Sequence, residues 1–316
     1  MATEFTEFHA ELRSVAGDLL AKQRAAAWPV LVEAGWVGLE IAEDLGGAGA
    51  TFAETALVCE ELGRAASASA YLGSGVLAVG TLNALQPSTT RDRLLTDLGS
   101  GTVRITVALD AVEFVPDADG ADVVLLVSED GVGVGDSTVT PRPVVDRTRS
   151  LSTVQTTVTE QLHFTGPPAK AVERLRQRAA TAIACDSLGL AEAMLAATVA
   201  YAKLRHQFGR PIGSFQAVKH ACADMAVRNT VARQLVGAAV EAVTADAPDA
   251  GVAVAMAKSY ACAAAVDVVG RAMQLHGGIG YTWESDIHVY LKRAVLNRSL
   301  FGSPAAHRRE LAKRYR

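Results

Sequence analysis

The sequence predicts a mainly helical protein with a small β domain in its middle. Toward both ends of the chain, apolar residues recur at the spacing of one helix face. Between these regions apolar residues alternate with polar ones, as in strands. We therefore predict an N-terminal helical domain at 1–98, a shortened β sheet or barrel at 99–166 and a C-terminal four-helix bundle at 167–316.

The composition is that of a globular protein. A chain of 316 residues that is 50% hydrophobic can bury a substantial core. A net charge of -4 provides no basic field, so nucleic acid is not an expected partner. The N-terminus is mixed polar and acidic, unlike a signal peptide, and we find no apolar run of the length that a bilayer requires. We expect a cytoplasmic protein that does not interact with a membrane.

The cysteines give no sign of a metal site or a redox pair. Each of them stands singly within an Ala- or Val-rich helical pattern. In a reducing cytoplasm such residues are expected to be small buried hydrophobic side chains, and no metal is predicted. The four residues are Cys59, Cys185, Cys222 and Cys262.

The N-terminal helical domain begins with two predicted helices. The first carries Leu12 and Leu19 on one stripe, and the second carries Trp28 and Leu31 and ends near Gly35. A glycine-rich connection at 35–49 then leads to a helix at 52–63, where the apolar spacing resumes.

The β domain is predicted from short apolar runs with a period of two. These runs lie near 103–107, 123–127, 132–134 and 154–158. Turn-forming residues separate them, including the Glu-Asp-Gly at 129–131. We predict a small antiparallel sheet or barrel.

The C-terminal bundle is predicted from four long helical patterns with short connections. The first covers 173–204, and the second begins at Ser214 as N-cap and continues to about Val243. The third covers 251–276, and the last begins near Trp283. Four such helices with short connections form an antiparallel bundle.

Two breaks in this bundle have the composition of an anion-binding site. The stretch 204–216 contains Arg, Gly and Pro residues that interrupt the helical pattern, and 274–281 contains one glycine pair followed by a third glycine. Helix ends leave backbone N–H groups unpaired, glycine permits a close approach, and Arg offers a planar fork of donors for a diphosphate. Each break alone is also compatible with an ordinary helix cap.

Together, the two breaks resemble the C-terminal signature of the acyl-CoA dehydrogenase family. The pattern R-x-Q-F-G-x-x-I-x-x-F-Q occupies 205–216, and Q-x-H-G-G-x-G-Y occupies 274–281. The connection at 35–49 is similar to the family's G-W-x-G-L-x-x-P-E-x-x-G-G-x-G, with Ala42 in place of the usual proline. The resemblance implies FAD as cofactor, an acyl-CoA substrate, and oxidation of that thioester between its α and β carbons.

The resemblance also implies a set of cofactor-binding residues in the two loops. Arg205 and Gln207 are expected at the diphosphate, Phe208 against the adenosine or the flavin edge, and Gln216 as support of the loop. The residues of the second loop are expected to close over the ADP part. For Phe208, packing between helices is the alternative, and for Arg205 it is a helix C-cap. The full set is Arg205, Gln207, Phe208, Gln216, Gln274, Gly277 and Gly278.

The middle of the chain departs from the family pattern. A T-E-P-x-x-G-S-D loop usually holds the flavin ring, but the aligned stretch 108–114 reads Ala-Leu-Asp-Ala-Val-Glu-Phe. A W-x-T/S element is also missing, since no tryptophan occurs between Trp36 and Trp283. We therefore expect that this half of the flavin pocket is lost.

The catalytic base of the family also has no counterpart at the expected positions. Phe301 stands where a Glu is usual, and the alternative position near Ala179 and Ala180 carries no acid. Glu284 and Asp186 are the nearest acidic candidates, both weak ones. No catalytic residue is therefore assigned to this chain.

These departures indicate a divided active site. In the family, one subunit supplies the flavin cradle and the base, and its neighbour grips the ADP part. This chain resembles the base-lacking subunit of an α2β2 acyl-CoA dehydrogenase of bacterial steroid side-chain degradation, with electron-transfer flavoprotein as the expected acceptor. Two alternatives stay open: a self-sufficient homomeric dehydrogenase or oxidase with a displaced base, and a non-catalytic scaffold.

Overall fold

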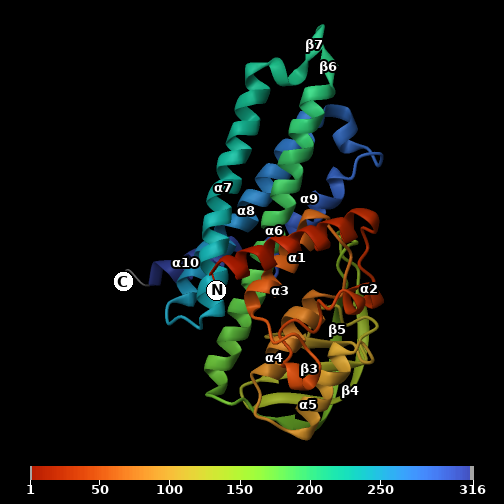
Figure 1. Ribbon diagram of the computed structural model, residues 1–316, viewed down its shortest axis with the longest axis vertical. Helices are drawn as coiled ribbons and strands as arrows, with labels where there is room; N and C mark the ends of the chain where they lie inside the picture. The colour runs from red at the N-terminus through yellow and green to blue at the C-terminus, as the bar shows by residue number, and fades with distance from the viewer. Residues whose placement is uncertain (1, 314–316) are drawn as a thin grey trace.

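The computed structural model describes residues 2–313 and places helices around one sheet, with a long helical bundle that extends away from that sheet (Figure 1). The prediction of a mainly helical chain with a small sheet is confirmed. The N-terminal helices are α1 (Ala2–Lys22), α2 (Trp28–Glu33), α3 (Phe52–Arg64), α4 (Val79–Asn83) and α5 (Thr89–Gly99), with the turn η1 (Glu43–Leu45) and the π-helical segment η2 (Leu72–Ala78).

A capping box formed by Thr51 and Glu54 marks the N-terminus of helix α3. The Thr51 hydroxyl accepts a hydrogen bond from the backbone N–H of Ala53, and the Glu54 carboxylate accepts one from the backbone N–H of Thr51 at 2.8 Å. Two otherwise unpaired donors are thereby satisfied. This cap fixes the start of the helix that packs against the bundle.

The sheet is mixed, so the prediction of an antiparallel sheet or barrel is wrong in one pairing. Its order is β1-β3-β4-β5-β2, and β1 pairs with β3 in parallel, because a long connection separates the two strands and allows a crossover. Pro141 lies within β4 where only β5 pairs with it, so its missing N–H is tolerated. The strands are β1 (Ile105–Ala108), β2 (Val115–Pro116), β3 (Val123–Ser128), β4 (Gly131–Arg142) and β5 (Leu151–Leu162).

The bundle forms as predicted, with shifted helix starts. Its first helix begins at Pro168, five residues earlier than expected, because proline suits the first helical turn. Ser214 is not a cap: it ends the turn η3 (Ile212–Ser214), and Phe215 precedes the next helix. Trp283 lies in the loop before α9, the fourth helix of the bundle. The helices are α6 (Pro168–Leu204), α7 (Gln216–Thr244), α8 (Ala250–His276), α9 (Ile287–Ser299) and the additional α10 (Pro304–Lys313).

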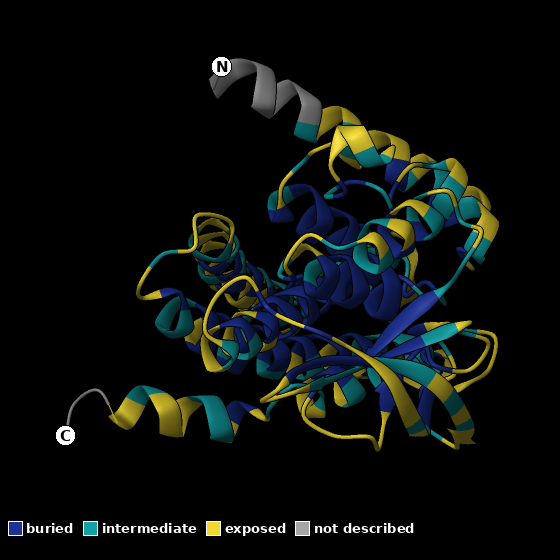
Figure 2. Cartoon of the chain, turned by 90° about the horizontal axis from the view of Figure 1, so that it is seen from below, coloured by how far each residue is buried: buried dark blue, intermediate teal, exposed yellow. Residues whose placement is uncertain are grey.

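Two bundle helices contain longer apolar segments than the sequence analysis predicts. The segments 168–204 and 250–281 are long and apolar enough to cross a membrane by length and composition, so that part of the prediction is wrong. In the fold, 67% and 61% of their apolar windows are buried, as expected for the core helices of a bundle. Figure 2 shows the buried residues concentrated at the centre, between the helices and the sheet.

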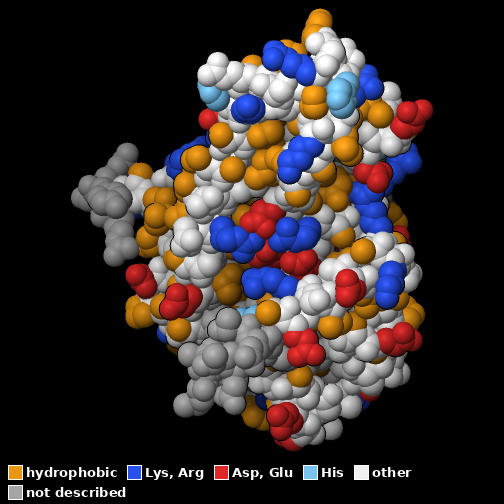
Figure 3. All heavy atoms as spheres, turned by 45° about the horizontal axis from the view of Figure 1, so that its top comes forward, with side chains coloured by type: hydrophobic (Ala, Val, Ile, Leu, Met, Phe, Trp, Pro, Cys, Tyr) orange, Lys and Arg blue, Asp and Glu red, His pale blue; other side chains and the backbone are white. Residues whose placement is uncertain are grey.

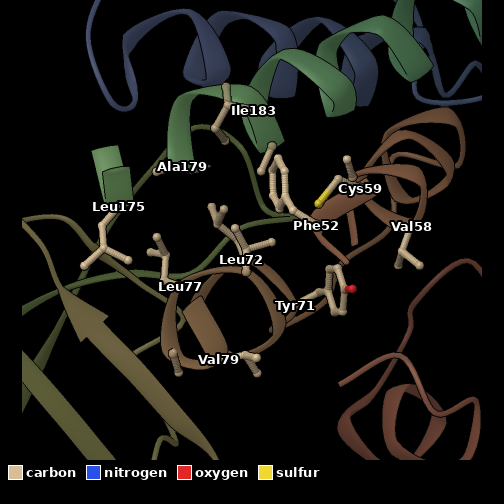
Figure 4. Close-up of a cluster of buried hydrophobic side chains, with 14 of the residues drawn as sticks. Phe52, Val58, Cys59, Tyr71, Leu72, Leu77, Val79, Leu175, Ala179 and Ile183 are labelled. Atoms are coloured by element: carbon tan, nitrogen blue, oxygen red, sulfur yellow. The ribbon is translucent and has the colours of Figure 1, made fainter. Parts of the chain in front are cut away.

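The main core joins the N-terminal helices to α6. Figure 4 shows Phe52 and Tyr71 together with leucines of η2, facing Leu175 and Ile183 on α6. Three cysteines are buried free thiols as predicted, but Cys222 is only half-buried. The boundaries 98/99 and 166/167 stay a prediction.

A buried ionic network connects three distant parts of the chain. Arg293 on α9 donates from Nε to the Asp186 carboxylate on α6 at 3.0 Å and from Nη1 to the Ser67 carbonyl at 2.7 Å. Arg149, from the loop between β4 and β5, also pairs with Asp186 at 3.0 Å. Asn297 donates to the same carboxylate at 2.6 Å. The network therefore holds α6, α9 and the sheet in one arrangement.

A second ionic cluster lies nearer the surface. Arg64 of α3 and Arg233 of α7 each bind Glu60 and Glu192, so α3, α6 and α7 are joined. Figure 3 shows acidic and basic side chains gathered near the middle of one face. Since Arg64 and Arg233 are more than a third exposed, this cluster contributes less to stability than the buried network.

Replacing Arg293 is expected to destabilise the fold strongly. Arg293→Met leaves Asp186 buried with only part of its partners, so the free energy of unfolding should fall by about 3–5 kcal/mol. Denaturant unfolding followed by circular dichroism measures it. The matched control Arg228→Met removes the exposed ion pair with Asp267 and should cost at most about 1 kcal/mol. Equal losses in both variants would contradict the assigned role of the network.

The buried carboxyl of Asp117 makes stability depend on pH. Burial raises the pKa of Asp117 to about 6, against the hydrogen bond from the Gly73 N–H and the charge of Arg149. Because the folded pKa exceeds the unfolded one, this contribution to stability is full below about pH 4 and is lost as pH rises to about 6.

Asp117→Asn is therefore expected to gain stability relative to the native chain as pH rises. The difference in unfolding free energy between the two proteins should increase by about 2 kcal/mol from pH 4.5 to pH 7. Denaturant titrations across this range measure it. Asp119→Asn, in the same turn but exposed, is the control and should show no such trend. A flat difference for Asp117→Asn would contradict the assignment.

Candidate functional site

The two glycine-containing loops lie together at the end of the bundle farthest from the sheet (Figure 1). One follows α6 and the other follows α8. The ring of Tyr201 stacks on the ring of His276, with centroids 4.3 Å apart and planes 21° apart. The Tyr201 hydroxyl also donates to the His276 carbonyl at 3.3 Å. The structure thus brings together the two sequence patterns that predicted a cofactor site.

The first loop is a hairpin with a two-residue turn. Strand β6 (His206–Gln207) pairs with β7 (Arg210–Pro211), and both central residues have positive φ, 53° at Phe208 and 76° at Gly209. Such a turn is of type I′, which glycine adopts freely and phenylalanine rarely does. The Phe208 side chain is 90% exposed at the tip and makes an edge-to-face contact with the Phe215 ring. An apolar ring is therefore held out toward solvent.

Two arginines belong to this hairpin: Arg205 directly precedes β6, and Arg210 lies in β7. The backbone of Arg205 is fixed, because its N–H donates to the Tyr201 carbonyl at 2.9 Å and its carbonyl accepts from the Ile212 N–H at 2.7 Å. Its exposed guanidinium makes no hydrogen bond or ion pair within the described residues. Arg210 lies over the Phe215 ring at 4.2 Å. Figure 3 shows basic and hydrophobic side chains side by side at this end of the molecule.

The second loop offers an open backbone. Gly277 has φ +63° and ends α8, and a Cβ built on Gly277 or Gly278 would meet nothing within 4 Å. Gln274 is exposed, with its side-chain oxygen accepting from the Tyr281 hydroxyl at 3.3 Å. Gln216 is exposed at the first turn of α7. These open donors and glycines fit the diphosphate of a dinucleotide such as FAD.

Both positions where a base was expected lie near one cavity. Phe301 and Ala180 line a space of about 540 Å³ between α6, α8 and α10, and neither can accept a proton. Ala179 is fully buried in the main core, as Figure 4 shows. Lys258 fixes the loop of Phe301, because its Nζ donates to the carbonyls of Asn297 at 3.0 Å and Gly302 at 2.9 Å.

Neither acidic candidate is placed to act as a base. The carboxylate of Asp186 is buried in the ionic network. Burial opposes its charge, but the charges of Arg293 and Arg149 and the hydrogen bonds from Arg293 and Asn297 hold its pKa below the usual range. Glu284 is exposed and does not line the cavity of Phe301. A carboxylate with a low pKa and one outside the cavity both lack what proton abstraction requires.

The sequence reading missed four carboxylates at the rim of the cavity. The side chains of Asp110, Glu173 and Glu310 are 42%, 54% and 62% exposed, and Asp249 is also exposed. They come from four separate segments, so no linear pattern could have indicated them. Their exposure leaves them solvated, unlike a desolvated catalytic base.

The stretch that aligns with the family's flavin-ring loop is a surface loop tied to α6. Arg176 donates from Nε to the Asp110 carboxylate at 2.7 Å, and Asp110 itself has φ +68°. Val112 and Phe114 are 42% and 53% exposed. This loop between β1 and β2 holds no arrangement of hydroxyl donors toward the cavity of Phe301.

Comparison with known proteins decides the family. Residues 1–102 match the family model of the acyl-CoA dehydrogenase N-terminal domain, and residues 171–315 match that of the C-terminal domain. Acyl-CoA dehydrogenase IpdE2 of Mycolicibacterium smegmatis is 36% identical over 286 residues, covering 90% of this chain and 86% of the relative. The chain belongs to the acyl-CoA dehydrogenase family. The resemblance predicted from the two loops is thus confirmed.

Further relatives agree. Acyl-CoA dehydrogenase IpdE2 of Mycobacterium tuberculosis is 38% identical over 281 residues, and the match covers 88% of this chain and 82% of the relative. A variant of the Tcur3481-Tcur3483 steroid ACAD has a TM-score of 0.86 at 25% identity, covering 98% and 97% of the two chains. The ChsE4-ChsE5 complex of M. tuberculosis has a TM-score of 0.85 at 23% identity, covering 96% of each chain.

Members of this family are FAD-dependent flavoproteins, so the predicted cofactor is confirmed at the level of the family. The described residues of this chain fit the ADP part at the two loops. They do not reproduce the ring-holding loop of the family in the stretch 108–114. The seven residues predicted to contact FAD stay a prediction, now with all seven exposed at one end of the bundle.

Replacing Glu284 tests the last sequence candidate for a base. In an assembly of this chain that oxidises acyl-CoA, Glu284→Gln should keep the rate within about twofold, because removing a true base costs roughly 100-fold or more. Reduction of an artificial electron acceptor measures the rate. Glu160→Gln on β5 is the matched exposed control. A large loss for Glu284→Gln alone would assign it the catalytic role.

Proposed function

We propose that this chain is a subunit of a heteromeric, FAD-dependent acyl-CoA dehydrogenase that contributes the ADP-gripping half of the cofactor site. The observation that carries the proposal is an asymmetry within one chain. Exposed groups that can donate hydrogen bonds to an anion lie at the loop end, the end of the bundle that carries the two glycine-containing loops. By contrast, Phe301 and Ala180 occupy the positions of a base in the cavity.

The loop end has the properties of a surface that a second subunit completes. Phe208 and Leu204 are 90% and 78% exposed, and Tyr281 and Trp283 of the second loop are 65% and 79% exposed. Apolar and aromatic side chains of this size on a surface mark binding sites. Beside them stands the guanidinium of Arg205, which has no partner among the described residues. An anionic cofactor placed under a partner subunit would satisfy both requirements.

The chemistry divides accordingly between the two subunits. When bound, FAD supplies the acceptor for the hydride that leaves the β carbon of the acyl group. Arg205 and Arg210 offset the diphosphate charge, and Gly277 and Gly278 let the backbone approach it. The partner subunit supplies the carboxylate that removes the α proton and the residues that hold the flavin ring. The phenyl ring of Phe301 in this chain has no group that can accept a proton.

The complexes among the similar structures support a heteromer. The Tcur3481-Tcur3483 and ChsE4-ChsE5 structures are named for two chains each, and the first is described as a steroid ACAD. By analogy we assign this chain to an α2β2 heterotetramer in the cytoplasm that acts on a steroid side-chain CoA thioester. Electron-transfer flavoprotein is the proposed electron acceptor.

A self-sufficient dehydrogenase is the second candidate. The four carboxylates at the rim of the cavity are the observation in its favour, because a conformational change that moves one of them inward would supply a base. Their exposure and the ion pair between Asp110 and Arg176 favour the first proposal. Expression of the chain alone separates the two.

The chain expressed alone should be colourless and inactive. Co-expression with a full-length acyl-CoA dehydrogenase homologue of the same genome that carries the T-E-P-x-x-G-S-D loop and a Glu base should give a yellow, active complex. In that complex Arg205→Ala should weaken FAD binding about 10- to 100-fold, since a charge-assisted contact to phosphate is lost. Absorbance at the flavin band and FAD titration measure this.

Arg147→Ala, an exposed arginine between β4 and β5, is the control and should bind FAD normally. If the isolated chain carries one FAD and oxidises acyl-CoA at an ordinary enzymatic rate, the divided site is wrong and the self-sufficient dehydrogenase takes its place. Normal FAD binding by Arg205→Ala in an active complex would contradict the assigned grip.

A further inference from the structure

Tyr201, near the end of α6, and His276, at the end of α8, contact each other in two ways. Their rings stack, and the Tyr201 hydroxyl donates a hydrogen bond to the His276 carbonyl. His276 is the histidine of the second sequence motif, and it directly precedes Gly277. Tyr201 lies outside both motifs, one helical turn before Arg205, at the start of the first motif.

Tyr201 acts on both loops at once. Its backbone carbonyl accepts the hydrogen bond of the Arg205 N–H at 2.9 Å, which fixes where the chain leaves α6. Its ring and its hydroxyl contact the ring and the carbonyl of His276. One residue thereby connects the backbone that carries the arginine to the backbone that carries the glycine turn.

His276 is held in turn by its own helix. Its Nδ1 lies 2.8 Å from the Ala272 carbonyl, and because a carbonyl only accepts, Nδ1 is the donor. The ring is therefore oriented by α8 before it meets Tyr201. A chain of contacts from Arg205 through Tyr201 and His276 to Ala272 makes the spacing of the two loops a fixed distance.

A diphosphate requires such a fixed distance. The anion is short, and groups from two loops must each reach it within hydrogen-bond tolerance, so a displacement of about 1 Å weakens the contacts. Helices α6 and α8 fix each other along the bundle, but their ends are where helices fray. An interaction that holds the ends of α6 and α8 together therefore improves the binding of a diphosphate between them.

We propose that Tyr201 and His276 are positioning residues that set the spacing of the Arg205 loop and the Gly277–Gly278 turn, so that both loops hold one diphosphate. This inference rests on the proposed function, in which these loops grip the ADP part of FAD. Neither residue contacts the reacting atoms, and their effect is on cofactor affinity.

Cofactor affinity and stability are measured separately in the co-expressed complex. Tyr201→Ala and His276→Ala should each weaken FAD binding about tenfold, because a stacked pair and its hydrogen bond are lost. Tyr201→Phe keeps the stack and should weaken binding no more than about threefold. At saturating FAD, kcat should return to within about twofold of the native value for all three variants.

The double variant Tyr201→Ala with His276→Ala decides whether the two residues act as a unit. If they do, the loss stays near tenfold, since the second substitution removes nothing further. A loss near 100-fold, the product of two independent effects, overturns the proposal. If Tyr201→Ala does not fold, Tyr201→Leu keeps the bulk without a flat ring or hydroxyl and replaces it.

Tyr260→Ala is the matched control. Tyr260 is half-buried like Tyr201, and it lies on α8, about 24 Å along the helix axis from His276. It should alter thermal unfolding without altering FAD affinity. The proposal is overturned if Tyr201→Ala binds FAD within twofold of the native complex, or if Tyr260→Ala weakens binding equally.

The failure of this inference can be told from failure of the proposed function. Arg205→Ala is titrated in parallel. If Arg205→Ala weakens FAD binding and Tyr201→Ala does not, the loops grip the cofactor without the positioning pair. If neither does, both the grip and the pair are rejected.

Discussion

The arrangement of this molecule depends on one buried carboxylate. Asp186 lies at the middle of α6 and accepts hydrogen bonds from Arg293 and Asn297 of α9, while Arg149 reaches it from the sheet. Taking a charge out of water is costly, and only several well-placed donors offset that cost. Two of these donors come from α9 and the third from the loop between β4 and β5, so the carboxylate is satisfied only when α6, α9 and the sheet have all assembled. The cavity lies on one side of this point and the loop end on the other.

The sequence indicated the fold because helices and strands leave different apolar periods. The helical spacing of apolar residues in α6 and α8 and their alternation in β3 and β5 are local properties of the sequence, so these elements are predicted correctly. The parallel pairing of β1 with β3 is not local, because it depends on how a connection crosses the sheet. The apolar length of α6 and α8 exceeds the prediction, because both helices are rich in small apolar alanines that pack closely in a bundle.

The site was only partly visible in the sequence, for the same physical reason. The Arg205 and Gly277 motifs are contiguous and could be recognised, and so could the loss of an acid at Phe301. The pairing of Tyr201 with His276 joins residues 75 positions apart, and the rim carboxylates come from separate segments. The sequence offers Asp186 as a candidate base, because it does not show that two arginines surround this carboxylate.

The continuity of α6 has a consequence for how this protein can vary. One unbroken helix of 37 residues carries Ala180 at the cavity, Asp186 in the ionic network and the exit toward Arg205. An α-helix turns by about 100° for each residue, so inserting or deleting a single position between these points would rotate one end against the other by that angle. Related chains can exchange side chains along this rod, but they cannot change its length there without swinging the arginine away from the glycine turn.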